Sequence, residues 1–205
     1  MFHYFDTFYF TDDNMTGISL IKSTIKRSRL FNGFINIAFN HYDEKRVAQI
    51  GPNAAAAEWI VKNEGLVKDN RESAMWIKDF NSISPCYGPK FKLAYVEAIG
   101  IDITSGGCRH FDGITHLKFI NLRNCVNIDD SGLQLIYKNS WNTLQYLDIA
   151  GTSISTEGLD FAAGFKKLEV LKYDHRLSSN IEKHALFKDR LKKVNSSLSI
   201  EMVRN

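Results

Sequence analysis

The sequence has few cysteines, the residues that mark disulfide-stabilised and many zinc-binding proteins: it holds three in 205 residues. Cys86, Cys108 and Cys125 are far apart and form no CxxC pair, so they predict neither a disulfide framework nor a common zinc site. A reducing compartment is therefore expected. No apolar run approaches the roughly 18 residues that a membrane-spanning helix needs.

Net charge is also small, because 26 basic residues are set against 23 acidic ones, which gives a formal charge of +3. That balance predicts no nucleic-acid partner in the absence of a local basic face. The chain has no nucleophile elbow, phosphate loop, HExxH or dinucleotide fingerprint, and His110 and His116 near Cys108 match no common zinc spacing. We expect a protein that is not an enzyme. The 44% of hydrophobic residues are enough for a substantial core.

What the sequence does have is a repeated spacing, apolar-x-x-apolar-x-apolar, in its second half. The four copies are Val96/Ile99/Ile101, Leu117/Ile120/Leu122, Leu144/Leu147/Ile149 and Leu168/Leu171/Tyr173. Their separations lie within the roughly 20 to 29 residue period of leucine-rich repeats. We predict an α/β fold, a short leucine-rich repeat solenoid of about four strand–helix repeats. Cys125 and Thr152 hold the turn position whose side chain can bond the backbone of a neighbouring turn.

An N-terminal helical module is expected to cap this solenoid. Residues 51–65 combine proline near the start, an alanine run and a final glycine, which predicts a helix with Trp59 facing the first repeat. The spacing of apolar residues in 71–80 suggests a second helix or helical turn. We place a targeting or disordered segment at 1–31, the cap module at 32–93 and the repeat domain at 94–205. Residues 181–194 are expected to be helical and 198–200 to form a terminal strand.

The segment from Met15 to Asn40 is basic, contains hydroxyl residues and has no acidic residue. That composition is typical of a mitochondrial presequence, and Met15 is a candidate start site. The alternative is a solvated basic helix that carries no address.

Residues between the core positions of the strands should lie on the inner, concave side of the solenoid in ranks about 4.8 Å apart. The expected ranks are Ala98/Phe119/Tyr146/Val170, Gly100/Asn121/Asp148/Lys172 and Asp102/Arg123/Ala150/Asp174. Phe119 and Tyr146, with Arg123 and Asp148 beside them, have the composition of a protein interface, and we predict that they bind a partner. Alternatively, the aromatic rings lie under the cap and the charges pair with one another.

Several stretches resemble the family of ATP synthase subunit s, also called coupling factor B, and its relative, the distal membrane arm assembly component of respiratory complex I. The stretches are Phe31-Asn32-Gly33 to Asn40, Gly51-Pro52 with Ala55 to Trp59, Asp79-Phe80-Asn81 and Asn127 to Asp130. The resemblance covers residues 31–205. It implies a mitochondrial, non-enzymatic protein on the matrix face of the inner membrane, peripheral to it, with a helical module that caps a short leucine-rich repeat domain.

The resemblance also implies a magnesium ion held by backbone carbonyls, at Gly51 of the Gly-Pro turn and near Pro85 in the loop before the first repeat. A redox-sensitive cysteine pair in one family member corresponds to Arg123 and Cys125. Only the second cysteine is present here, so a dithiol switch is not expected.

Three functions remain open from the sequence. The first is a coupling factor that associates with the membrane sector of mitochondrial ATP synthase and supports proton-driven energy coupling. The second is a factor that binds assembly intermediates of the membrane arm of complex I. The third is a cytosolic leucine-rich repeat substrate adaptor, for which residues 1–50 offer no obvious helical docking box.

Overall fold

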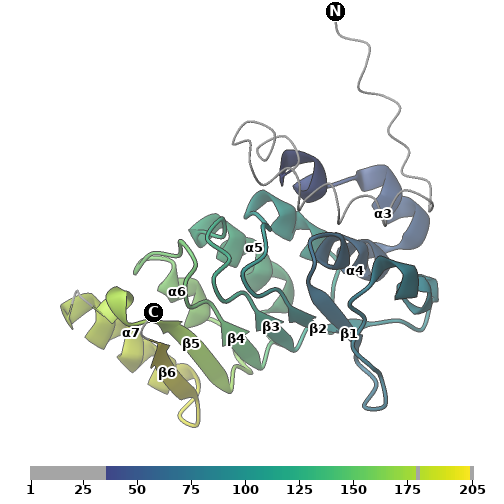
Figure 1. Cartoon of the computed structure of the whole chain (residues 1–205). Helices are drawn as coiled ribbons and strands as arrows, with labels where there is room; N and C mark the ends of the chain where they lie inside the picture. The colour runs from purple at the N-terminus through teal and green to yellow at the C-terminus, as the bar shows by residue number, and fades with distance from the viewer. Residues whose placement is uncertain (1–35, 179–180, 204–205) are drawn as a thin grey trace, which may run out of the picture. The chain divides into compact units, whose positions relative to one another are not determined.

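A single six-stranded sheet organises the chain, and its strands follow one another in sequence order (Figure 1). Its strands are β1 (Leu66–Asp69), β2 (Leu93–Glu97), β3 (Phe119–Asn121), β4 (Tyr146–Asp148), β5 (Val170–Asp174) and β6 (Ser199–Val203). β1 runs antiparallel to β2, whereas β2 to β6 are all parallel. The computed structural model describes residues 36–178 and 181–203, so the predicted targeting segment lies outside the described residues. Residues from Phe39 onward form one compact unit, which contains the whole sheet.

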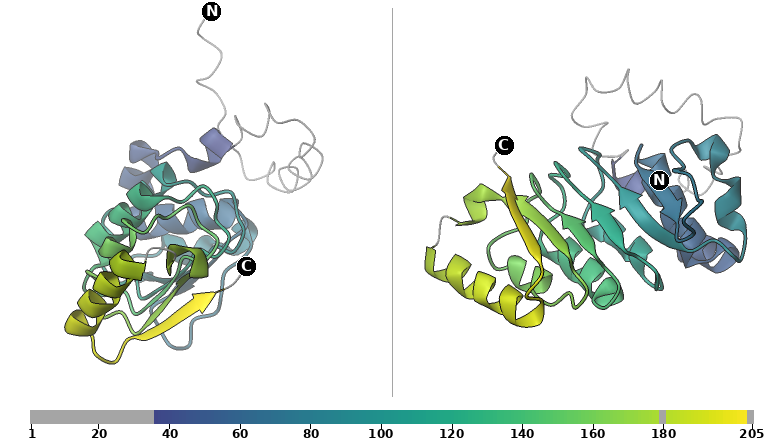
Figure 2. Two further views of the ribbon diagram at one scale, coloured as in Figure 1. Left: turned by 90° about the vertical axis from the view of Figure 1, so that its left-hand side faces the viewer. Right: turned by 90° about the horizontal axis from the view of Figure 1, so that it is seen from below.

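Helical segments return the chain between the parallel strands and lie on one side of the sheet (Figures 1 and 2). They are η4 (Gly106–Phe111), α5 (Asp130–Ser140), α6 (Leu159–Ala162), and η5 (His175–Ser178) with α7 (Ile181–Val194). Four strand–helix units are thus followed by a terminal strand, and the predicted leucine-rich repeat solenoid is confirmed. The apolar side of each strand meets these helices, so the repeats share one continuous core.

The N-terminal cap contains α3 (Glu44–Ile50) and α4 (Pro52–Lys62), with the short 3-10 turns η2 (Phe80–Ser82) and η3 (Ser84–Tyr87). α4 is the helix predicted from the alanine run, and its residues from Ala54 to Val61 are buried. Proline occupies its first turn, where a missing N–H costs no helical hydrogen bond. The cap also supplies β1, a strand that the sequence pattern did not predict.

Of the helix or helical turn predicted for residues 71–80, the helix is wrong; one turn closes at its start, where the Ala74 N–H donates to the Arg71 carbonyl at 3.1 Å. Val67 of β1 exchanges two backbone hydrogen bonds with Ile77, at 3.0 and 2.8 Å, and this bridge holds the segment extended. The chain therefore doubles back along the outer edge of β1, and helical residues appear only from Phe80 onward.

The first repeat lies three residues earlier than the sequence pattern suggested. Val96 pairs with Ile120 in the sheet, and its repeat is therefore Leu93/Val96/Ala98. Ala98 is fully buried, whereas Ile99 is 46% exposed and precedes Gly100, which has a φ of +64°. In the first repeat the small Ala98 side chain therefore occupies the core position. The larger Ile99, which the sequence pattern placed in the core, faces solvent.

Trp59 and Cys125 have the packing roles that the sequence predicts. Trp59 is buried, stacks on His110 at 4.9 Å and meets the edge of Phe111 at 5.4 Å, so it packs against the first repeat as predicted. Cys125 donates its thiol to the carbonyl of Ala98 in the preceding repeat, at 2.7 Å, which confirms its structural role. Thr152 instead bonds the Ile149 carbonyl within its own turn.

Among the described residues, no helix combines the length and apolar character that crossing a membrane requires.

Candidate partner-binding surface

The side of the sheet away from the helices carries the predicted site. Phe119 and Tyr146 lie in β3 and β4, immediately before the buried core residues Ile120 and Leu147. Because successive side chains of a strand point to opposite faces, burial of the second residue turns the first toward the concave face. Phe119 and Tyr146 are register partners, and their rings stack with centroids 4.2 Å apart.

The stack is longer than the sequence indicated, because Tyr95 and not Ala98 is the register partner of Phe119. The Tyr95 and Phe119 centroids are 6.2 Å apart. Trp76, from the extended segment beside β1, meets Tyr95 at 6.3 Å and Phe119 at 6.4 Å, each nearly edge-on. We call Trp76, Tyr95, Phe119 and Tyr146 the aromatic strip. Its four rings are partly exposed, with Trp76 at 40%.

Two rings of the aromatic strip, Tyr95 and Tyr146, each have a lysine over them. The Lys68 ammonium is 5.1 Å from the Tyr95 ring centroid, and that of Lys172 is 5.9 Å from the Tyr146 centroid. Lys172 also pairs with Glu201 at 2.6 Å, and the hydrogen bond to that carboxylate raises the pKa of Lys172. Burial and the nearby Asp148 raise the pKa of Tyr146, so its hydroxyl keeps its proton and can donate to a ligand.

The two predicted charged residues form one ion pair. Arg123 lies 3.0 Å from Asp148 and is about one-third exposed, whereas the Asp148 side chain is buried. Asp148 also accepts the Ala150 backbone N–H at 3.0 Å, which fixes the turn after β4. In this arrangement Arg123 is the residue that a partner could touch, and Asp148 holds it in place.

Both sequence interpretations of this face therefore find support in the contacts. The charges pair with each other across strands, as the structural alternative proposed. Trp76 of the cap module packs beside Tyr95 and Phe119, but the rings of the strip remain partly exposed. Sequence reasoning missed Trp76 because its spacing from Met75 and Phe80 had been attributed to a helix, and it missed Tyr95 because the first repeat was placed three residues too late.

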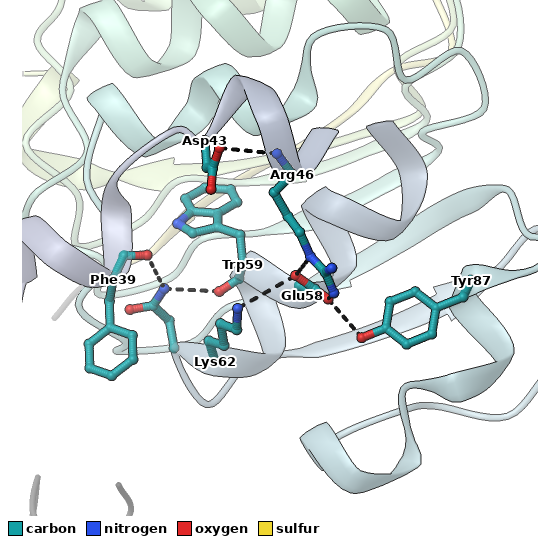
Figure 3. Close-up of polar contacts among 8 residues, drawn as sticks. Phe39, Asp43, Arg46, Glu58, Trp59, Lys62 and Tyr87 are labelled. Atoms are coloured by element: carbon teal, nitrogen blue, oxygen red, sulfur yellow. Dashed lines mark hydrogen bonds and ion pairs between the residues drawn. The ribbon is translucent and has the colours of Figure 1, made fainter. Parts of the chain in front are cut away.

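A second polar cluster ties the cap together around Glu58 of α4 (Figure 3). The buried Glu58 carboxylate pairs with Arg46 of α3, accepts the Tyr87 hydroxyl at 2.7 Å and lies 3.5 Å from Lys62. Burial raises the pKa of Glu58, but the Arg46 hydrogen bond, the Lys62 charge and the Tyr87 hydroxyl outweigh it, and the pKa lies below its ordinary value. This cluster joins α3, α4 and η3 and is structural.

Comparison with known proteins agrees with the geometry. The Leucine Rich repeat family matches residues 113–136, which include β3 and the first part of α5, and residues 142–161, which include β4 and the start of α6. Human mitochondrial ATP synthase subunit s is 30% identical over 149 residues, 71% of this chain and 72% of the relative. This chain belongs to the ATP synthase subunit s family. The bovine subunit s is 27% identical over 147 residues, covering 70% of this chain and 73% of the relative.

A further similarity reaches a protein with a different name. Distal membrane arm assembly component 2 of Drosophila melanogaster is 27% identical over 126 residues, 60% of this chain and 44% of that protein. The resemblance described from the sequence is thus confirmed for both branches.

The magnesium ligands implied by the subunit s family occupy two points of the cap. The Gly51 carbonyl accepts the Ala55 N–H at 3.0 Å in the first turn of α4 and retains a second lone pair, so it is compatible with a cation. Pro85 stands in the first turn of η3. Across residues 36–178 and 181–203, no three His, Cys, Asp or Glu side chains are grouped as metal ligands, so a magnesium site would depend on carbonyls and water, and it stays a prediction.

Proposed function

We propose that this member of the subunit s family is a non-enzymatic mitochondrial protein that associates with ATP synthase and supports proton-driven coupling through protein–protein contacts. The aromatic strip is the observation that supports contact as the mode of action. Four adjoining rings on an open sheet face form an unusually aromatic surface, and such surfaces are enriched at the centres of protein interfaces.

The proposed contact places Phe119 and Tyr146 at its centre, with Arg123 at its border. Their rings stack on each other and already have fixed orientations, so little side-chain entropy is lost when a partner covers them. Asp148 would act indirectly by orienting the Arg123 guanidinium. The membrane sector of ATP synthase, approached from the matrix side of the inner membrane, is the proposed partner.

Affinity purification from mitochondria, followed by native gel analysis, tests this proposal. Phe119→Ala with Tyr146→Ala should weaken the association by about 2 kcal/mol or more, roughly 30-fold in Kd. Trp141→Ala is the matched control, because it removes a 37% exposed aromatic ring that lies outside the aromatic strip. A correctly folded double variant that co-purifies at the wild-type yield would rule out this surface.

Similarity to distal membrane arm assembly component 2 favours a second candidate, a factor for assembly of the membrane arm of complex I. The same purification separates the two candidates, because the partner subunits and the position on the native gel differ. We place the cytosolic adaptor behind both, since the similarities to mitochondrial subunit s extend over 71% of the chain.

Location and metal have separate tests. A fluorescent fusion that begins at Met15 should reach mitochondria and one that begins at Asn40 should not, if residues 15–31 direct import.

Magnesium at the Gly51 and Pro85 carbonyls should raise the melting temperature of the purified protein in a concentration-dependent way. Calcium and sodium chloride serve as controls for selectivity and ionic strength.

A further inference from the structure

β6 is the last strand at the C-terminal edge of the described sheet. Within the part of the chain that the structure describes, β6 has one neighbour, β5, and nothing is paired with its other side. An exposed edge offers backbone N–H and C=O groups to another strand, and proteins commonly block such edges with proline, charge or a covering segment. β6 contains no proline, and its one charged side chain, Glu201, is paired with Lys172.

The hydrogen bonds define which residues face outward. Ser199 donates its N–H to the Glu169 carbonyl at 2.8 Å, so it is directed toward β5. Because backbone groups alternate along a strand, Glu201 and Val203 also face β5, and Ile200 and Met202 direct their N–H and C=O groups away from the sheet.

The side chains of these two residues continue the core. Ile200 is the register partner of Leu171 and Met202 that of Tyr173, both of which are buried. Ile200 packs on the core, whereas Met202 remains 39% exposed at its end. An apolar column thus reaches the outer edge of β6, beside which residues 36–178 and 181–203 place no further strand.

A second copy of the same strand fits this edge in one favoured register. In an antiparallel pair whose two-fold axis passes Glu201, Ile200 of each copy faces Met202 of the other. Both residues direct their backbone groups outward, so each Ile200–Met202 pair forms two hydrogen bonds and joins the two apolar columns. Axes at Ile200 or Met202 use fewer residues of the five-residue strand. We propose that the chain self-associates through β6, so that two sheets become one.

The register has one unfavourable feature that makes it testable. Glu201 would lie opposite its own copy as a non-hydrogen-bonded pair, in which side chains approach closely and like charges repel. The Lys172 ammonium, 2.6 Å from each Glu201, offsets this repulsion in part. Removing the charge should therefore strengthen the association, which is the opposite of what loss of a favourable contact would do.

Sedimentation velocity of the full chain up to hundreds of micromolar tests the proposal. The wild type should show a reversible monomer–dimer equilibrium, and Glu201→Gln should lower the dimer Kd about two- to fivefold. Met202→Pro should abolish the dimer, because it removes an outward N–H while leaving the β5 pairing intact. Met75→Ser, which alters a methionine that is 82% exposed on the cap, should leave the Kd unchanged.

Two results would overturn this inference. A wild-type chain that stays monomeric at every concentration would exclude self-association. A dimer that Met202→Pro does not affect would place the interface elsewhere. If the chain is monomeric and Met202→Pro instead reduces co-purification with a mitochondrial complex, the edge receives a strand of another protein and the second copy is excluded. The aromatic-strip proposal does not depend on any of these outcomes.

Discussion

The two ends of the sheet are finished in different ways. At the N-terminal end, β1 adds an antiparallel strand, Ile77 bridges to its outer edge and α4 packs on the first repeat. At the C-terminal end, β6 pairs with β5 and has no second neighbour among the described residues. Among the residues that the structure describes, the N-terminal edge of the sheet is therefore paired, and the outer edge of β6 is not.

The two ends of the sheet also differ in the side-chain contacts that hold them. The N-terminal end is held by a buried carboxylate with three polar partners and by a tryptophan between aromatic rings. The C-terminal end combines apolar contacts with buried polar ones, among them the Tyr173 hydroxyl with His184 Nε2 at 2.7 Å and Asp174 with Arg176 at 3.2 Å. The closed end should therefore be the last to unfold, and the open end is available for contact with another chain.

The largest expected effect comes from opening the closed end. Trp59→Ala removes a ring that stacks on His110 and meets Phe111, and it also removes the indole N–H that bonds Asn40 at 3.2 Å. The free energy of unfolding should fall by about 3 to 5 kcal/mol. Urea denaturation measures this loss, and Trp141→Ala, which removes a partly exposed ring, should cost less than Trp59→Ala. An unchanged denaturation midpoint for Trp59→Ala would mean that the cap does not stabilise the repeats.

Glu58→Gln should have the next largest effect, about 2 kcal/mol. The loss is smaller than for a wholly buried pair because Arg46 and Lys62 reach water at 41% and 29% exposure of their side chains. The folded-state pKa of Glu58 is depressed, so its stabilisation is present above its ordinary pKa of 4.5 and is lost as pH falls through the folded value.

Acid titration of stability checks the same residue. The wild type should lose stability below about pH 4.5 more steeply than Glu58→Gln, which has no carboxylate to protonate. Equal slopes for the two proteins would show that the Glu58 cluster does not govern the acid response of the cap.

The sequence predicted the regular parts of the fold and missed the irregular ones for a physical reason. The helix over 51–65 and the three later repeats follow from patterns in which each apolar residue is also a core residue. In the first repeat this correspondence fails, because Ala98 is buried and Ile99 is exposed. A spacing of apolar residues cannot show that the smaller of two neighbours fills the core.

Trp76 was missed for a related reason. Its contacts depend on the bridge between Val67 and Ile77, which joins segments ten residues apart and leaves no local periodicity. Phe119 and Tyr146 could be placed correctly because both belong to repeats in which the core positions were identified correctly. The sequence could not predict that Asp148 is buried. A carboxylate at that position of the repeat gives the same sequence pattern whether it is exposed or paired with a neighbouring arginine.

At the open end, His184→Gln should cost about 1 kcal/mol at neutral pH through the weakened bond to Tyr173. Burial lowers the pKa of His184, and the charges of Lys188 and His175 lower it further. The neutral ring therefore stabilises the fold above its ordinary pKa of 6.5, and this contribution is lost as pH falls through the folded value.

A matched variant separates the two ends in this titration. Burial also lowers the pKa of His110, which stacks on Trp59 in the cap. His184→Gln and His110→Gln should each remove part of the stability lost between neutral pH and about pH 5. If His184→Gln retained the full wild-type pH dependence, the Tyr173–His184 pair would not be the acid-sensitive element at the open end.

The smallest expected effect is a difference in amide hydrogen exchange between the two edges of the sheet, which can be measured on the wild-type protein. In dilute protein, the outward amides of Ile200 and Met202 should exchange with deuterium faster than those of Ser199 and Glu201, which face β5. At the closed end the Val67 amide donates to the Ile77 carbonyl at 3.0 Å and should be protected although it lies at the outer edge of β1. Hydrogen exchange read by NMR at several concentrations distinguishes two causes of protection. If the Ile200 and Met202 amides exchange more slowly as the protein concentration rises, a second copy covers β6. If both amides are already protected at high dilution, the chain itself covers this edge, and the two ends of the sheet do not differ in this respect.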